Sequence, residues 1–210
     1  GVTLGTTTAD GAGVWAYDYT GTAIANGNYT LTASTTDILG NTGTATQAIT
    51  IDTNAPGQNG DGTAPAITSI TNDSGTAGDF ITNDQTLIFN GTAGAGDVVT
   101  VKLDGVTLGT ATANGAGVWS YDYTGTTIAN GTYTLAASTT DIAGNTATAS
   151  QAITIDTNAP GQNGDGTAPA ITAITNDSGT AGDFITNDQT LIFNGTAGAG
   201  DVVTVKLDGV

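Results

Sequence analysis

DTNAPGQNGDGTAP, residues 52–65, decides how this chain is organised, because the same residues return at positions 156–169. A shift of 104 residues aligns residues 1–106 with residues 105–210, and only ten positions differ. Self-similarity at one period is the sequence signature of a repeat array, in which each repeat is one structural unit. The sequence therefore predicts a tandem array, and the quoted stretch is the joint between successive repeats.

The joint divides the array into three parts. Residues 1–62 are the later part of one repeat, residues 63–166 are a complete repeat, and residues 167–210 begin a third. Residue 1 corresponds to the glycine of an Asp-Gly turn inside a repeat, so we expect the chain to be a piece of a larger protein. Neither terminal part holds a full set of strands. We expect either that terminal parts of adjacent chains complete each other, or that the array simply continues.

The complete repeat alternates short β-branched and aromatic runs with Gly, Asn and Asp clusters, a pattern typical of strands and turns. Asp104-Gly105 is the dipeptide that a type I′ hairpin turn requires, because both of its central residues need positive φ. The sequence predicts seven strands, at residues 66–71, 85–92, 97–103, 106–112, 118–123, 132–141 and 146–156. We therefore predict an all-β fold, with tandem immunoglobulin-like antiparallel β-sandwich repeats of seven strands.

Trp119, Tyr121 and Tyr123 alternate with polar residues and therefore share one face of a strand. Large rings on one face are typical of a core, although an exposed Trp119 could instead stack on a glycan. Tyr133 follows a turn and fits the position of a tyrosine corner. The many threonines could form an ice-binding array, but Thr is also an ordinary strand former on a sheet with few charges.

The charge of the chain is strongly negative. It contains 19 Asp, no Glu and only two cations, Lys102 and Lys206, for a net charge of −17. This charge excludes nucleic acid as a partner and favours divalent cations, although Asp also simply solvates a surface. Cys, His and Met are absent, which removes disulfides, imidazole bases and the usual zinc and iron sites. We expect no enzyme, no small-molecule substrate and, without an apolar run near 18 residues, no membrane insertion.

Successive strands of a sandwich run in opposite directions, so the loops and their carboxylates gather at its two ends. The exit end of the complete repeat collects Asp73, Asp79, Asp84, Asp156 and Asn158, and the opposite end collects Asp61, Asp97, Asp141 and Asn145, with Asp165 in the next joint. Ca²⁺ binds six to eight oxygens, which carboxylates, amides and carbonyls of Gly-rich loops supply. No EF-hand loop or GGxGxD solenoid motif is present, and Asx turns use the same residues without metal. We predict Ca²⁺ sites at and near the joints.

GTAGDFITNDQTLIFNGTA, KLDGVTLGTATANGAGVWSYDY and NGTYTLAASTTDIAGNTATASQAITIDTNAP together resemble the bacterial immunoglobulin-like extender repeats of giant RTX adhesins, including ice-binding adhesins. The resemblance covers all 210 residues. It implies secreted repeats at the bacterial cell surface that bind Ca²⁺, stiffen, and project a separate ligand-binding domain. The positions of this chain that match the family's calcium ligands are Asp73, Asp79, Asp141, Asn145, Asp156 and Asp165.

These observations predict a structural spacer that Ca²⁺ stiffens at the joints between repeats, so that the partners of each repeat are its neighbours in the same chain. Without ion, like charge and Gly freedom at each joint are expected to let the array flex. The alternative is an adhesive module that binds a glycan through Trp119 or ice through its threonines.

Overall fold

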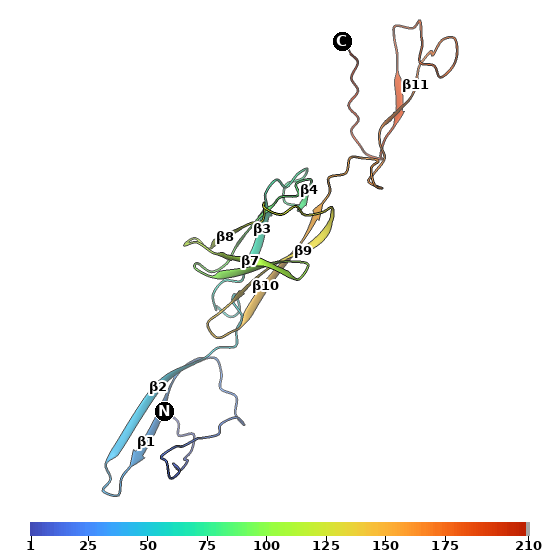
Figure 1. The fold of residues 1–210 in the computed structure, drawn as a ribbon. Helices are drawn as coiled ribbons and strands as arrows, with labels where there is room; N and C mark the ends of the chain where they lie inside the picture. The colour runs from blue at the N-terminus through green and yellow to red at the C-terminus, as the bar shows by residue number, and fades with distance from the viewer. Residues whose placement is uncertain (209–210) are drawn as a thin grey trace.

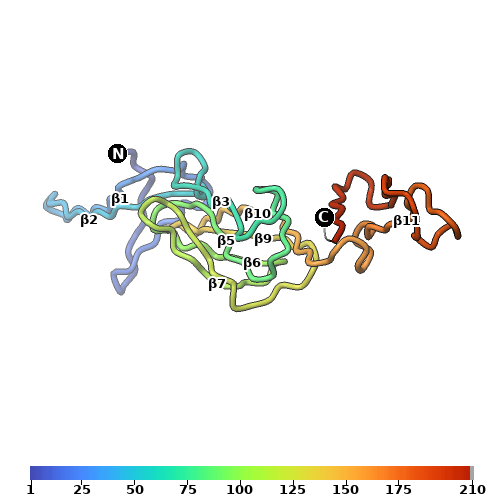
Figure 2. The backbone as a smooth tube through the Cα atoms, turned by 90° about the horizontal axis from the view of Figure 1, so that it is seen from above, coloured from blue at the N-terminus to red at the C-terminus, as the bar shows by residue number. Residues whose placement is uncertain are grey.

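Strands make up all the regular secondary structure of residues 1–208, the part of the chain that this computed structural model describes. Figure 1 shows three parts following one another along an extended molecule, with the chain termini at opposite ends. The first part contributes the hairpin β1 (Gly27–Thr36) and β2 (Thr42–Ile51), and the last part contributes β11 (Ala170–Ile174) and β12 (Phe193–Thr196). Figure 2 shows the last part standing clear of the central one. The described residues contain no helix long and apolar enough to span a membrane.

The central part, residues 63–166, is a two-layer β-sandwich. Its strands are β3 (Ala66–Ile70), β4 (Ile81–Thr82), β5 (Ile88–Thr92), β6 (Val98–Leu103), β7 (Val106–Thr112), β8 (Val118–Asp122), β9 (Gly131–Thr140) and β10 (Thr146–Ile155). One sheet has the order β4-β10-β9-β6-β7 and the other has the order β3-β5-β8. All pairings except β4 with β10 are antiparallel. The predicted all-β immunoglobulin-like sandwich is confirmed.

One strand was not expected. The sequence predicts a polar loop over residues 72–84, but Ile81 and Thr82 form β4, which pairs in parallel with Thr154 and Ile155 of β10. Phe80, before it, is buried with φ of 62°, and the Thr82 hydroxyl donates to the carbonyl of Asn72 at 2.5 Å. A two-residue strand is too short to show a period of two, and its partner lies about seventy positions away. Local sequence therefore carries no signal for it.

The core lies between the two sheets, where the predicted aromatic face packs. Trp119 is 1% exposed and its indole N–H donates to the carbonyl of Thr92 at 3.1 Å. The glycan-stacking alternative for Trp119 is therefore wrong, because the ring is not presented to solvent. The Tyr133 hydroxyl donates to Ala129 O at 3.0 Å, the contact expected of a tyrosine corner. Asp104 and Gly105 both have positive φ, 47° and 80°, as the predicted hairpin turn requires.

The terminal parts contain fewer strands than the repeat pattern predicts. Four strands are expected in residues 1–62 and three in residues 167–210, but each part forms two strands within the described residues. The counterparts of β7 and β8 are not formed in the first part. In the central part these strands pair with β6 and β5, and the first part holds no copy of either partner. Sheet partners, rather than strand propensity, therefore decide which segments become strands here.

Candidate metal centre

The joint between the first and central parts is a folded loop. Gln58 N donates to Ala55 O at 2.9 Å and Asp61 N to Gln58 O at 2.8 Å, while Gly57 N donates to Asp61 O. The Asn59 side-chain amide donates to Asn54 Oδ1 at 2.9 Å. Asn59 itself has φ of 49°, a left-handed conformation that Asn tolerates better than most residues. These bonds return the chain on itself, which brings Asp61 back toward the end of β2.

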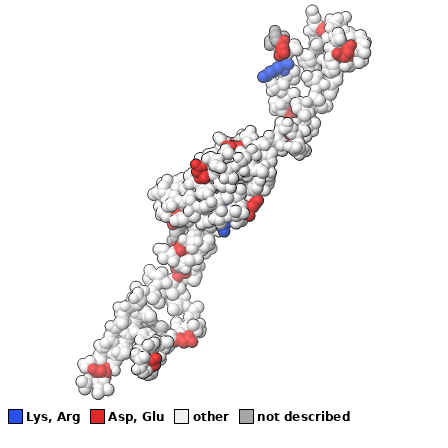
Figure 3. All heavy atoms as spheres, viewed as in Figure 1, with Lys and Arg blue, Asp and Glu red and all other residues white. Residues whose placement is uncertain are grey.

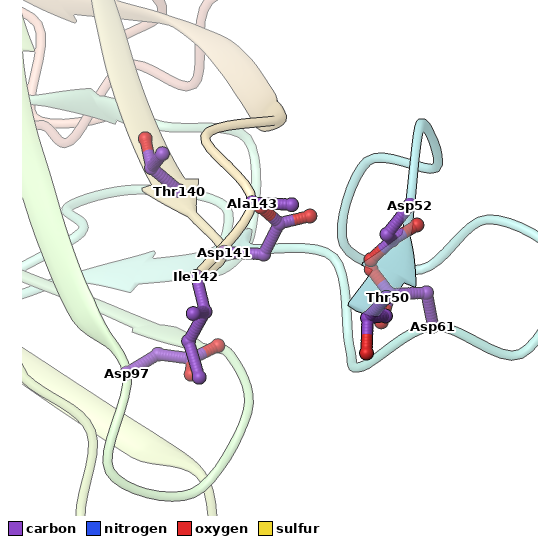
Figure 4. Close-up of a pocket in the computed structure, with 8 residues that line it drawn as sticks. All are labelled: Thr50, Asp52, Asp61, Asp97, Thr140, Asp141, Ile142 and Ala143. Atoms are coloured by element: carbon purple, nitrogen blue, oxygen red, sulfur yellow. The ribbon is translucent and has the colours of Figure 1, made fainter. Parts of the chain in front are cut away.

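Three carboxylates meet at this loop. Asp52 follows the last residue of β2, Asp61 ends the turn of the loop, and Asp141 begins the β9–β10 turn of the central part. One carboxylate oxygen of each lies within 4.8 Å of the others. In Figure 4 Asp52 and Asp61 stand on one side of the site and Asp141 on the other. The cluster is therefore shared between two successive repeats.

The β9–β10 turn holds Asp141 in place through Asn145. Asn145 N donates to Asp141 Oδ1 at 2.8 Å and its side-chain amide donates to Asp141 Oδ2 at 2.9 Å. These bonds hold the pKa of Asp141 below its usual value, the side-chain bond contributing most. The same amide also donates to Asp52 O at 3.2 Å, which ties the turn to the preceding repeat. The turn therefore favours the ionised form of Asp141 and holds its carboxylate facing the joint.

The pKa of Asp61 is shifted in the opposite direction to that of Asp141. Loss of solvent raises its pKa, and the neighbouring charges of Asp52 and Asp141 raise it further. Its Oδ2 atom is buried and makes no hydrogen bond. A buried, unpartnered carboxylate oxygen beside two like charges is unfavourable unless a cation balances it. A divalent cation would give this oxygen a partner and would also balance the repulsion among the three carboxylates.

The cluster opens on a hollow of about 610 Å³. Thr50, Asp52 and Asp61 line one side, and Asp97, Thr140, Asp141, Ile142 and Ala143 line the other (Figure 4). Asp97 Oδ2 accepts a bond from Gly94 N at 3.0 Å, which fixes its loop. On the face drawn in Figure 3, acidic atoms are seen at the narrow stretch between the first and central parts.

The donor set fits Ca²⁺. Two oxygens bound to one Ca²⁺ at 2.3–2.6 Å lie at most about 5 Å apart, which matches the spacing of the three carboxylates. All donors are hard oxygens, whereas zinc prefers nitrogen and sulfur, and the chain contains neither His nor Cys. Water and backbone carbonyls would supply the further oxygens that Ca²⁺ requires. Asp52, Asp61 and Asp141 are therefore the residues that would hold the ion.

The second joint provides an internal comparison. Its loop repeats the bonds of the first, with Gln162 N to Ala159 O at 2.9 Å, Asp165 N to Gln162 O at 2.8 Å and the Asn163 amide to Asn158 Oδ1 at 3.0 Å. Asp156 Oδ1 accepts bonds from Asn158 N at 2.9 Å and, more weakly, from the Asn130 amide at 3.5 Å. The loops of the two joints therefore share one hydrogen-bond pattern.

The predicted residues at the exit end, Asp73, Asp79 and Asp84, make hydrogen bonds within their own loops. Asp79 Oδ1 accepts from Ile81 N at 2.9 Å, and Asp84 binds the Asn72 amide at 2.6 Å and Thr86 N at 2.8 Å. Asp73 Oδ2 accepts from Gly78 N at 2.6 Å, while its Oδ1 is buried without a partner. Within residues 1–208, no second group of three carboxylates lies as close as the cluster at the joint. Calcium ligation by Asp73, Asp79 and Asp84 stays a prediction.

Sequence reasoning brought Asp61, Asp97, Asp141 and Asn145 to one end of the repeat, and the structure places all four at the first joint. It missed Asp52. The signal was present, because Asp52 is the copy of the predicted Asp156 one period earlier. The sequence does not show the path of the folded loop, and this path brings Asp52 at the end of one repeat toward the next repeat.

Comparison with known proteins identifies one matching family profile. The profile of the bacterial Ig-like domain matches residues 1–53 and 63–157. Comparison with curated protein sequences finds no significant match.

Among solved structures, the chain is similar to a 1.5-MDa bacterial ice-binding adhesin, with 25% identity over 62% of this chain and 41% of that one and a TM-score of 0.34. A Ca²⁺-stabilized, ice-binding adhesin of an Antarctic bacterium gives 27% identity, 71% and 35% coverage and a TM-score of 0.34. A tetra-tandem repeat from the extending region of a large adhesion protein is 22% identical over 82% of this chain and 40% of that one, with a TM-score of 0.35. The chain thus spans 35–41% of the length of these structures.

Proposed function

The chain belongs to the bacterial Ig-like domain family, and on this premise we propose that it is a calcium-binding extender segment of a bacterial cell-surface adhesin. In this role its repeats act as spacers between the cell and a separate ligand-binding domain. Ca²⁺ bound at and near the joints stiffens the array. The partners of each repeat are its neighbours in the same chain, and the protein works outside the cell.

The observation that carries this proposal is the cluster of Asp52, Asp61 and Asp141 across the first joint. Asp52 lies at the end of one repeat and Asp61 in the loop that follows it, whereas Asp141 belongs to the next repeat. An ion bound by all three must hold the two repeats together, because releasing either repeat costs ligands. Metal affinity is thereby converted into joint rigidity.

The sequence of the chain supports the same role. A net charge of −17 with 19 Asp leaves the repeats mutually repulsive until divalent cations neutralise them. The absence of Cys and His suits a structural, oxygen-ligated ion rather than a reactive one. The exit-end carboxylates Asp73, Asp79 and Asp84 are candidates for a further site, with the buried Asp73 Oδ1 as its unpartnered oxygen.

The proposal is tested by calorimetric Ca²⁺ titration and by small-angle scattering with and without chelator. Calcium should raise the melting temperature and lengthen the maximum dimension of the chain. Asp141→Asn should remove one site and the lengthening. Asp37→Asn is the matched control, because Asp37 accepts the equivalent turn bonds from Asn41 at 2.8 and 2.9 Å and belongs to no close group of three carboxylates among the described residues. A scattering profile unchanged by chelator contradicts the stiffening of the array by calcium. A titration without heat contradicts calcium binding.

The ice-binding alternative stays a prediction. The threonines do reach the surface of the sheet, where Thr140 and Thr146 hydrogen-bond at 2.8 Å and Thr132 and Thr154 at 3.0 Å. Their mutual bonds are those of ordinary cross-strand Thr pairs. A thermal-hysteresis assay on the 210-residue chain decides this alternative, and no hysteresis removes it.

A further inference from the structure

We propose that the Asn-Gly pairs at residues 59–60 and 163–164, in the loops of the two joints, are sites at which the chain modifies its own backbone by deamidation. An Asn followed by Gly is the pair most prone to this reaction, because glycine has no side chain to hinder the approach of its backbone nitrogen. The inference is independent of metal binding and of the proposed extender role.

The reaction needs no reagent other than water. The backbone nitrogen of Gly60 attacks the side-chain carbonyl carbon of Asn59, and the new N–C bond closes a succinimide ring. The side-chain amide nitrogen leaves as ammonia, which carries away the proton of the Gly60 N–H. Water then opens the ring. Opening at the side-chain carbonyl gives Asp, whereas opening at the backbone carbonyl gives isoaspartate, in which the main chain gains the side-chain methylene carbon.

The other Asn-Gly pairs of the chain are held in ways that oppose this attack. In four of them the glycine belongs to a paired strand, namely the pairs at residues 26–27, 90–91, 130–131 and 194–195. In the pair at residues 114–115, Asn114 Oδ1 accepts bonds from Ala116 N at 2.9 Å and Val118 N at 3.1 Å, which fix its side chain. Such pairs react only after the structure around them opens locally.

The joint pairs carry neither restraint. Asn59 and Gly60 are exposed and lie outside the strands. Within residues 1–208, Gly60 N and Asn59 Oδ1 make no hydrogen bond to protein, and the Asn59 side chain is held only by the 2.9 Å bond from its amide to Asn54 Oδ1. Nothing lies within 4 Å of a carbon built on Gly60. The pair at residues 163–164 repeats these features, with its amide bond at 3.0 Å.

The modification would change the shape of the joint. Asn59 lies inside the turn that the bond from Asp61 N to Gln58 O closes at 2.8 Å. An added methylene carbon in the main chain lengthens this turn. A carboxylate in place of the Asn59 amide also cannot donate to Asn54 Oδ1, because an ionised carboxylate only accepts hydrogen bonds. The position of Asp61 in the carboxylate cluster therefore changes as the protein ages.

Ageing the 210-residue chain in chelator at mildly alkaline pH tests the proposal, because base removes the proton of the attacking amide. Mass spectrometry of peptides locates deamidation, and isoaspartyl methyltransferase labels isoaspartate. Asn59 and Asn163 should react in the folded chain at nearly the rate measured in urea. Folding should slow Asn90 and Asn130 by about tenfold or more, because their strands must open first. Equal rates at all these sites in the folded chain overturn the proposal.

Two sets of variants sharpen the test. Asn59→Gln with Asn163→Gln keeps both amides but requires a larger ring that closes more slowly, so isoaspartate should nearly disappear from the folded chain. Asn114→Gln is the matched control and should leave the signal unchanged. Isoaspartate that persists in the double variant overturns the proposal.

The effect on the joint is measured separately. Residual dipolar couplings should show a changed relative orientation of the first two repeats in the aged chain. Asn59→Asp supplies the new charge without the added methylene carbon, so its couplings should change less. Equal couplings in the aged and fresh chains overturn the inferred change of shape.

Discussion

The side-chain amide of Asn145 donates a 3.2 Å hydrogen bond to the backbone carbonyl of Asp52, a residue 93 positions earlier in the preceding repeat. The bond crosses the joint between the two repeats. It places the β9–β10 turn against the end of β2, where the three carboxylates converge. This hydrogen bond therefore helps to organise the joint.

Replacing Asn145 with Ala should loosen the joint in chelator. The control Asn41→Ala removes the equivalent bond within its turn, the 2.9 Å bond to Asp37 Oδ2, and among the described residues the Asn41 amide makes no bond to another repeat. The difference between the variants therefore isolates the contact to Asp52, about 0.5–1.5 kcal/mol for one hydrogen bond. Residual dipolar couplings measure the relative orientation of the two repeats. Equal orientational order in both variants would show that the bond is dispensable.

Asp61→Asn should have opposite effects with and without metal. In chelator the substitution removes a desolvated charge that Asp52 and Asp141 disfavour, so the melting temperature should rise. In calcium it removes a ligand charge, so the calcium-dependent rise in melting temperature should shrink. Asp165→Asn, at the same position of the second loop, is the control. Calorimetric scans in both conditions measure the effect, and a melting temperature lowered in chelator would refute the electrostatic account.

The raised pKa of Asp61 predicts how the joint responds to pH. An acid whose pKa is raised by folding stabilises the fold fully below its ordinary value, about 3.9 for Asp, and loses that contribution as pH rises through the raised value. In chelator the contribution of Asp61 to the stability of the joint is therefore greatest at acidic pH, whereas the contribution of Asp141, whose pKa is lowered, is lost there. Calcium affinity runs the other way, because the ion must displace the proton from Asp61. Titrations at several pH values should show affinity falling on acidification, less steeply in Asp61→Asn, and equal slopes would contradict this.

Trp119→Ala should lower the free energy of unfolding of the central repeat by about 3–5 kcal/mol, the usual cost of emptying a large core site. The site is 1% exposed and holds the bond to Thr92. Trp15→Ala changes the same residue type at the equivalent place in the first part, where the ring is 52% exposed. Denaturant unfolding should give a much smaller change for Trp15→Ala.

Gly91→Ala should destabilise the central repeat by about 1–3 kcal/mol, the range for overpacking. A methyl group there would overlap the carbonyl of Ala66 and the indole of Trp119, both part of the packed sandwich. Gly115→Ala is the matched control, because nothing lies within 4 Å of the added carbon. Thermal unfolding of both variants provides the comparison. A loss of stability in Gly115→Ala as large as that in Gly91→Ala would show that backbone entropy, not packing, governs both sites.

Features that depend on local sequence were predictable. The Asp104-Gly105 turn follows from the φ values that Asp and Gly tolerate, and the burial of Trp119 follows from a strict alternation of two. The predicted grouping of Asp61 and Asp141 needed only the alternating directions of the strands. Each of these inferences uses neighbours within a few residues or the topology of one sandwich.

Features that depend on distant partners were not predictable. β4 forms because Ile81 and Thr82 pair with the edge of β10. Two residues are too few to show the alternation that indicates a strand in the sequence. Asp52 joins the cluster of carboxylates because the loop of residues 55–61 doubles back through bonds that Gly-rich composition does not reveal. That composition predicts a flexible linker, whereas the loop is held by its own backbone and amide bonds. In both cases the decisive contacts lie outside the window in which sequence patterns operate.

The loops of the two joints have the same shape. Gly57 and Gly161 both have φ of 87°, and Asn59 and Asn163 have φ of 49° and 48°. A connector that folds by itself applies nearly the same rotation and translation each time it occurs, and in stacked repeats such a constant step sets the curvature and twist. Successive repeats would then follow a screw axis, so that equivalent faces recur at regular angles around it. An array of this kind is a superhelix, and the geometry of one loop sets its pitch.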